Sequence, residues 1–224
     1  MNPMFLKDVE NAPGGGSSAQ AIQHRRAAGL PVAQILHLLA FKPDRTEPLM
    51  QFAQAVMRGA SPLSTGEREL IAAFTSRCNN CLFCANSHTA VAAELLGSRE
   101  LVDATLNDYT TAPISDKLKA LLAFVEKVTR DAAQITQTDV DTATLAGWSD
   151  EALYDAITVC AMFNFFNRWV NATGVSDMPP AAYQLGGKRM AVEGYAPSPI
   201  ANISDPVSFP SLATPFQDVL RHPT

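Results

Sequence analysis

The spacing of apolar residues constrains this fold more than any other feature of the sequence. From about residue 17 to residue 178, apolar side chains recur at the intervals of three and four that are typical of helices buried along one face. Residues 115–130 (SDKLKALLAFVEKVTR) show the pattern most clearly, and glycine or proline ends most of the runs. The sequence contains no alternating run bounded by hairpin turns. We therefore expect an all-α fold.

The turn residues of the chain divide it into three predicted segments. Residues 1–16 end in Pro-Gly-Gly-Gly and are expected to form an N-terminal arm. Residues 17–178 carry the helical pattern and are expected to form one all-helical domain. Residues 179–224 are rich in proline and have few periodic stretches. They are predicted to be an extended C-terminal tail that wraps the core or a neighbouring subunit.

Composition excludes several classes of protein. A chain of 224 residues with 47% hydrophobic and 17% charged residues is typical of a packed domain rather than a disordered one. The net charge of −5 and the lack of a basic block argue against a nucleic-acid partner. No apolar run approaches the roughly 20 residues that a membrane span needs. The N-terminus lacks a basic region followed by a long apolar stretch, so we expect a cytoplasmic protein.

Three of the four cysteines lie in the stretch CNNCLFCANSH (78–88), together with a histidine. In a reducing compartment, clustered thiols are more often catalytic or metal-binding than structural. Asn80 is a favourable N-cap for a helix that runs from Cys81 toward Gly97. At about 100° per residue, Cys84 and His88 then lie on the same face of that helix as Cys81.

This arrangement indicates redox chemistry. Cys81 is expected in the first helical turn, where the free N–H groups and the helix dipole favour a thiolate. A Cys-x-x-Cys pair at a helix start can alternate between dithiol and disulfide. His88 lies one turn beyond Cys84, close enough to exchange a proton with it.

A carboxylate on the preceding helix can orient this histidine. Ser64-Thr65-Gly66-Glu67 is a capping box, which predicts that a helix begins at this point and that Glu67 is engaged in the cap. If that helix packs antiparallel to the cysteine helix, we expect Glu69 to face His88 across their interface.

Two other interpretations of the stretch stay open on the residues alone. Cys78, Cys81, Cys84 and His88 could supply four ligands to zinc or to an iron–sulfur cluster, in a metal-binding regulatory or structural module. Against this, no Cys-Pro follows and no second ligand cluster is present. Alternatively, the thiols could be vestigial in an oligomeric scaffold. Cys160, in the middle of an apolar run, is predicted to be a small core residue.

The pattern of Glu69, eleven residues, Cys81-x-x-Cys84, three residues and His88 resembles the signature of AhpD-like alkylhydroperoxidases. These enzymes belong to the carboxymuconolactone decarboxylase superfamily. The segment AMFNFFNRWVNATGV (161–175) is also similar to the peroxidase-related branch, and the resemblance covers about residues 30–178. It implies an AhpD-like helical bundle that assembles as a homo-oligomer, a trimer or hexamer, with a dimer also possible.

The resemblance implies an antioxidant reduction of hydroperoxides without a bound cofactor. By this likeness Cys84 is the peroxidatic cysteine, Cys81 resolves it as a disulfide, and Glu69 and His88 form a proton relay. An external dithiol, a lipoyl-type adaptor in the best-known members, then reduces the disulfide. The decarboxylase members lack the cysteine pair, so lactone decarboxylation is not expected.

Two positions depart from the family pattern. Phe83 occupies the position before the second cysteine, where the best-known members have histidine. This removes one proton-transfer group and makes the site more apolar. Cys78 adds a third thiol that could form an alternative disulfide.

Overall fold

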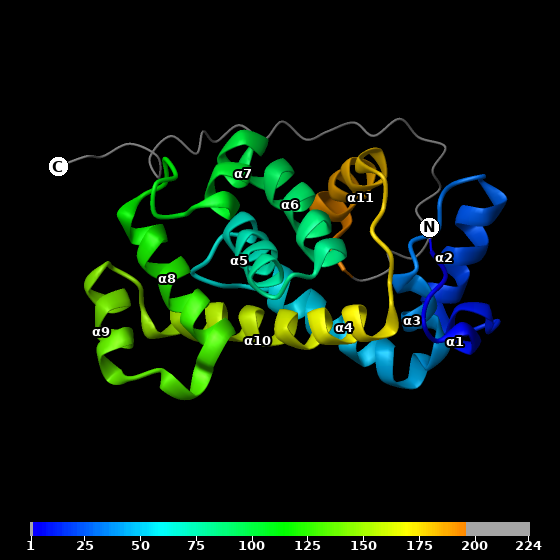
Figure 1. Cartoon of the computed structure of the whole chain (residues 1–224), viewed down its shortest axis with the longest axis horizontal. Coiled ribbons are helices and arrows are strands. Elements are labelled where there is room, and N and C mark those ends of the chain that lie inside the picture. The colour runs from blue at the N-terminus through cyan, green and yellow to red at the C-terminus, as the bar shows by residue number, and fades with distance from the viewer. Residues whose placement is uncertain (1, 196–224) are drawn as a thin grey trace.

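The computed structural model describes residues 2–195, and Figure 1 shows the arrangement of its helices. Within those residues there are eleven α-helices, one short 3-10 turn and no strand, which confirms the predicted all-α class. The helices are α1 Lys7–Asn11, α2 Gly16–Ala27, α3 Ile35–Phe41, α4 Pro43–Arg58, α5 Thr65–Cys78, α6 Leu82–Leu96, α7 Arg99–Asn107, α8 Asp116–Asp131, α9 Gln137–Leu145, α10 Asp150–Thr173 and α11 Pro180–Glu193. None of the helices in this part of the chain is both long enough and apolar enough to span a bilayer.

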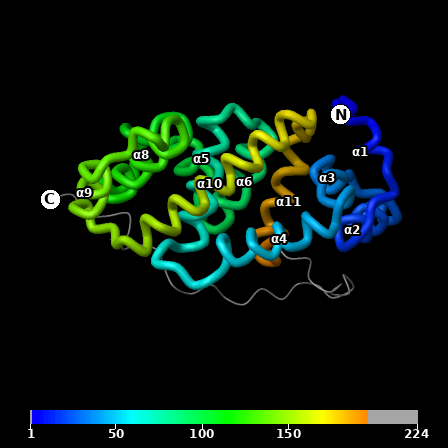
Figure 2. Tube along the Cα trace, turned by 90° about the horizontal axis from the view of Figure 1, so that it is seen from below, coloured from blue at the N-terminus to red at the C-terminus, as the bar shows by residue number. Residues whose placement is uncertain are grey.

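Helix α10 runs along the long axis of the molecule, and α5, α6, α7 and α11 lie on one side of it (Figure 1). Helices α8 and α9 lie at one end and α1, α2 and α3 at the other, and the view turned by 90° in Figure 2 shows the same order. The main core lies where α5, α8 and α10 meet, around Ile71, Leu122 and Phe163. A smaller cluster contains Cys81 and Cys84.

Helices α5 and α6 form an antiparallel pair. The predicted capping box is present at the start of α5, where the Ser64 Oγ accepts from the Glu67 N–H and the Glu67 carboxylate accepts from the Ser64 N–H. Gly66 allows close contact with the end of α6, because a Cβ at this position would lie 2.6 Å from Leu96. The start of α5 therefore packs against the end of α6, as the placement of Glu69 required.

The turn between these helices differs from the prediction by one residue. Asn80 adopts a left-handed conformation with φ of 53°, which asparagine tolerates better than most residues. Cys81 is the N-cap, and α6 begins at Leu82. The predicted helix start at Cys81, with Asn80 as N-cap, is therefore wrong, because an N-cap needs a backbone near the β region. Gly97 ends α6 in the left-handed conformation, as expected.

Both flanking segments contain a helix that the sequence analysis did not predict. Helix α1 lies within the N-terminal arm. Residues 180–193 of the predicted extended tail form α11, which packs closely against α6. The contact depends on Gly187, since a Cβ at this position would lie 2.8 Å from the Cβ of Ala90. Residues 196–224 of the predicted tail lie outside the described residues.

Candidate active site

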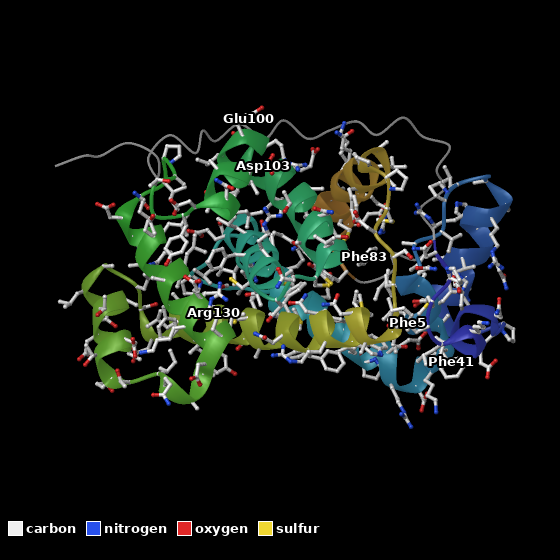
Figure 3. The ribbon with its side chains drawn as sticks, in the orientation of Figure 1. Phe5, Phe41, Phe83, Glu100, Asp103 and Arg130 are labelled. Carbon is white, nitrogen blue, oxygen red and sulfur yellow. The ribbon has the colours of Figure 1, made fainter. Side chains whose placement is uncertain are left out.

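The predicted cysteine pair is buried at the start of α6. Cys81 is 0% exposed and Cys84 is 4% exposed, so only Cys84 retains access to solvent. The buried apolar side chains around the pair include Phe83 of α6, Val170 of α10 and Tyr183 of α11. Phe83 lies at the end of α6 nearest α10, and its ring is 6.2 Å from that of Tyr183 (Figure 3). The residue that replaces the family's histidine thus forms part of an apolar wall beside the thiols.

The two thiols form a hydrogen bond that makes them electrostatically unequal. The side-chain hydrogen bond from Cys84 lowers the pKa of the Cys81 thiol, although burial acts in the opposite direction. The same hydrogen bond, together with burial, raises the pKa of the Cys84 thiol far above its ordinary value. The charge of the reduced pair is therefore favoured on Cys81, which is the residue where a thiolate was expected.

Asn167 of α10 is a third member of this contact. Its side chain is buried, and hydrogen bonds from it lower the pKa of Cys81 and oppose the rise of the pKa of Cys84. The amide is held from both ends. Asn79 Nδ2 donates to Asn167 Oδ1 at 2.9 Å, and Asn167 Nδ2 donates to Ser76 Oγ at 2.9 Å. This role was not predicted from the sequence, where the nearest signal is the family-like segment 161–175.

Glu69 and His88 meet across the interface of α5 and α6, as predicted. His88 Nδ1 lies 2.7 Å from Glu69 Oε2, and Arg58 Nη2 lies 2.7 Å from Glu69 Oε1. Burial of Glu69 would raise its pKa. The charge and hydrogen bond of His88, with those of Arg58, outweigh burial and hold the pKa of Glu69 below its ordinary value. Glu69 is therefore a buried carboxylate that stays ionised because it is paired.

Arg58 and Tyr195 complete this cluster, and neither was predicted from the sequence. The Tyr195 hydroxyl lies 3.0 and 3.2 Å from the two carboxylate oxygens of Glu69 and 3.1 Å from His88 Nδ1. The Arg58 guanidinium lies 5.1 Å from the centre of the Tyr195 ring. Burial and the negative charge of Glu69 raise the pKa of Tyr195. Both residues are far from the cysteine motif in sequence, so no local pattern indicates them.

One predicted contact is not formed directly. In the described part of the chain, no hydrogen bond joins His88 to Cys81 or Cys84. The His88 ring instead packs edge-on against Phe163, with centroids 4.4 Å apart. A proton that moves between His88 and the thiols would therefore pass through a water molecule or a bound substrate.

Cys78 lies apart from the reactive pair. It ends α5 and packs against the main core, whereas Cys81 and Cys84 belong to the smaller cluster. Burial is the main cause that raises the pKa of Cys78 to about 11, and Arg130 only partly opposes it. In Figure 3, Arg130 on α8 lies well away from Phe83 beside the pair. Cys78 is therefore poorly placed to act as a third redox thiol.

The residues proposed as metal ligands in the metal-binding alternative do not come together in the fold. Within residues 2–195, no group of three or more His, Cys, Asp or Glu side chains is arranged to hold a metal ion. His88 is paired with Glu69, and Cys78 packs in a different cluster from the other two cysteines. Cys160 is a buried core residue, as predicted, with its Sγ 3.1 Å from Thr129 Oγ1.

Known proteins resemble the chain in sequence and fold. Residues 43–127 match the profile of the carboxymuconolactone decarboxylase family. The solved structure of an alkylhydroperoxidase AhpD core, an uncharacterized peroxidase-related protein from Ralstonia eutropha JMP134, superposes with a TM-score of 0.71 at 25% identity and covers 84% of this chain and 98% of its own. An uncharacterized peroxidase-related protein from Silicibacter sp. TM1040 has a TM-score of 0.68 at 28% identity and covers 82% and 95%.

A more distant structure extends the range of chemistries on this fold. The debrominase Bmp8 has a TM-score of 0.60 at 19% identity and covers 78% of this chain and 96% of its own. At this identity the likeness concerns the fold alone. No curated protein gives a significant match to the chain.

Proposed function

Because the chain belongs to the carboxymuconolactone decarboxylase superfamily, whose members are enzymes, and has an AhpD-like fold, we propose that it is a thiol-dependent peroxidase. The observation that carries the proposal is the hydrogen-bonded pair of Cys81 and Cys84, buried beside an ionised Glu69 that is paired with His88. In this proposal the enzyme reduces organic hydroperoxides in an antioxidant role.

The proposed reaction forms one disulfide for each peroxide reduced. The thiolate of Cys84 attacks the terminal oxygen of the hydroperoxide, the O–O bond breaks, and the alkoxide leaves with a proton as the alcohol. Cys84 is then a sulfenic acid. The Cys81 thiolate attacks the Cys84 sulfur, and the hydroxide leaves with a second proton as water. Two thiol hydrogens and two electrons are transferred to the peroxide.

We assign the first attack to Cys84 because it is the thiol that retains exposure. In the reduced pair the charge is favoured on Cys81, so the Cys84 proton must first move to Cys81 or toward His88. A histidine held by a buried carboxylate is suited to accept that proton and to return it to the leaving alkoxide. The relay thus accepts the proton of Cys84, the thiol that stays protonated in the hydrogen-bonded pair.

The burial of the cysteine pair also favours a long, narrow molecule as the reductant. A donor must reach Cys84 past the apolar wall, and Cys81 has no exposed surface at all. An extended dithiol such as a lipoyl arm fits this access better than a thiol on a folded protein surface. We therefore propose an external dithiol of the lipoyl type as the electron donor.

The surface of α10 supports the proposed homo-oligomer. Tyr154, Ile157 and Phe165 are large apolar side chains that are 70%, 40% and 49% exposed. They recur at helical spacing along one face of α10, which provides an apolar stripe for a second copy of the chain. A trimer, a hexamer and a dimer are each compatible with this stripe, and a cytoplasmic location remains our expectation.

Mass spectrometry of the 78–88 peptide tests the proposed function. After the reduced protein reacts with cumene hydroperoxide, we expect a Cys81–Cys84 disulfide, with Cys78 and Cys160 still reduced. Cys84→Ser should abolish peroxide consumption, and Cys81→Ser should trap a sulfenic acid on Cys84. Cys78→Ser is the matched control and should react like the wild type. If peroxide leaves the thiol titre of the wild-type protein unchanged, the proposed function is wrong.

A further inference from the structure

Tyr195 lies in the Glu69–His88 cluster although it comes from the far end of the described chain. Its hydroxyl contacts both oxygens of Glu69 and the Nδ1 of His88. Tyr183, which lies close to the thiols, cannot take this place because its hydroxyl donates to Asp177. Tyr195 is therefore the phenol that can act on the proposed relay.

The backbone around Tyr195 is built to hold the ring in this position. The Tyr195 N–H donates to Gln54 Oε1 at 2.7 Å, and Arg58 Nη2 donates to the Met190 carbonyl at 3.0 Å. Gly194 has a φ of 73°, and a Cβ at this position would lie 2.6 Å from Gln54 Oε1. The positive φ favours glycine there, and any larger residue would also have to displace the end of the Gln54 side chain. Helix α4 thus fixes the end of α11 so that the phenol enters the site.

The charges around Glu69 determine how the Tyr195 hydroxyl can influence His88. Glu69 accepts hydrogen bonds from Arg58 of α4 and from Tyr195, and it also pairs with His88 of α6. The charge of Arg68 of α5 also interacts with Glu69. Each donor that shares the negative charge of Glu69 weakens the pull of that charge on a protonated His88.

We propose that Tyr195 is a positioning residue of the relay, whose hydroxyl shares the charge of Glu69 and thereby limits how strongly that carboxylate favours a protonated His88. The inference rests on the proposed function for its catalytic meaning. The phenol remains a donor throughout, because burial and the adjacent carboxylate oppose its ionisation. A negative charge on Cys84 would also oppose ionisation of Tyr195.

The variant Tyr195→Phe tests the proposal because it removes only the hydroxyl and keeps the ring over Arg58. Without this donor, Glu69 should favour a protonated His88 more strongly. We expect the acid limb of single-turnover disulfide formation, driven by cumene hydroperoxide, to move to higher pH by about 0.5 to 1 unit. The rate at neutral pH should fall several-fold, with little change in the peroxide concentration needed for half-maximal rate.

The matched control is Tyr109→Phe. This variant also removes a phenol that donates to a glutamate, Glu126, but it leaves the relay untouched. We expect its pH profile to match the wild type. A Tyr195→Phe enzyme that is slower by the same factor at every pH would indicate a packing role, and one identical to the control would mean that the hydroxyl does nothing. Either result overturns the proposal.

An NMR titration of the His88 ring protons separates this inference from the proposed function. We expect the titration midpoint to rise in Tyr195→Phe and to stay constant in Tyr109→Phe, whether or not the protein consumes peroxide. If the wild type ignores peroxide but the midpoint still rises, the proposed function fails and the coupling of Tyr195 to His88 stands. If the midpoint does not move while peroxide is consumed, the coupling fails alone.

Discussion

At the scale of the residue, the amide of Asn167 shows how one polar side chain can set the balance between two thiols. It is buried, held by Asn79 and Ser76, and hydrogen-bonded to both cysteines of the pair. A buried thiolate without such donors would be strongly disfavoured. The amide therefore stabilises a negative charge on whichever sulfur carries it.

Asn167→Ala should raise the pH at which the pair first forms a thiolate, by about 0.5 to 1 unit. The reason is that the pKa of Cys81 is lowered in part by this amide. The thiolate absorbance near 240 nm, followed against pH in the reduced protein, measures the change. Asn171→Ala is the control, since it makes the same substitution at an exposed site on the same helix. Equal titrations of the two variants would contradict this role for Asn167.

The same scale shows which site residues a sequence can reveal. Glu69 and His88 were predictable because a short turn joins their two helices, so the spacing along the chain fixes which side chains meet. Arg58 and Tyr195 meet the same carboxylate through folds of the chain that no local spacing encodes. Asn80 was assigned the wrong backbone conformation because asparagine serves equally well as an N-cap and in a left-handed turn.

At the scale of the element, α11 is a helix that the local sequence pattern does not predict. Pro179 is its N-cap, Pro180 is its first residue, and Gly186 and Gly187 lie within it, so the intrinsic propensity of the two glycines argues against a helix. Packing against α6 stabilises α11 despite its low intrinsic helix propensity, because Gly187 allows the backbone of α11 to approach Ala90 of α6. Tertiary contact thus overrides the local signal, whereas the capped and amphipathic helices α5 and α8 were predictable.

Gly187→Ala should destabilise the protein by about 1–3 kcal/mol, because the added methyl meets Ala90, including its backbone, at less than the normal contact distance. Urea unfolding at neutral pH measures the change in the free energy of unfolding. The neighbouring Gly186→Ala is the control. Its Cβ would have nothing within 4 Å, so the variant should be unchanged or gain up to about 1 kcal/mol from helix propensity. If both variants unfold alike, the close approach of the helices does not limit stability.

At the scale of the whole molecule, the site is assembled from helices that are distant in sequence. Helix α4 provides Arg58, α5 provides Glu69, α6 provides the thiols and His88, and α10 provides Asn167. The sequence predicted the helical class and the α5–α6 unit, since both follow from local periodicity and spacing. It did not predict how α4, α10 and α11 close around that unit, because this depends on packing between distant segments.

Glu69 couples this assembly to global stability, and the coupling has a definite sign. The pKa of Glu69 is lower in the folded protein than in the unfolded chain, so folding stabilises the ionised carboxylate relative to the protonated form. Its contribution to stability is therefore fully present above the ordinary carboxyl pKa of about 4.3 and is lost as the pH falls through the lower folded value. At neutral pH, Glu69→Gln leaves Arg58 without its buried counter-charge and His88 without its carboxylate partner.

We expect Glu69→Gln to reduce the free energy of unfolding at pH 7 by about 3–5 kcal/mol, as when one partner of a buried ion pair is removed. The difference from the wild type should shrink as the pH falls below about 4.3, because the unfolded chain then gains a proton on Glu69 and the contribution of the ionised carboxylate to stability declines. Urea unfolding of both proteins at several pH values measures this. Asp103→Asn, in an exposed ion pair with Arg99, should change stability by less than about 1 kcal/mol. A wild-type to Glu69→Gln difference that stays constant from pH 7 to pH 3 would show that ionisation of Glu69 does not stabilise the fold.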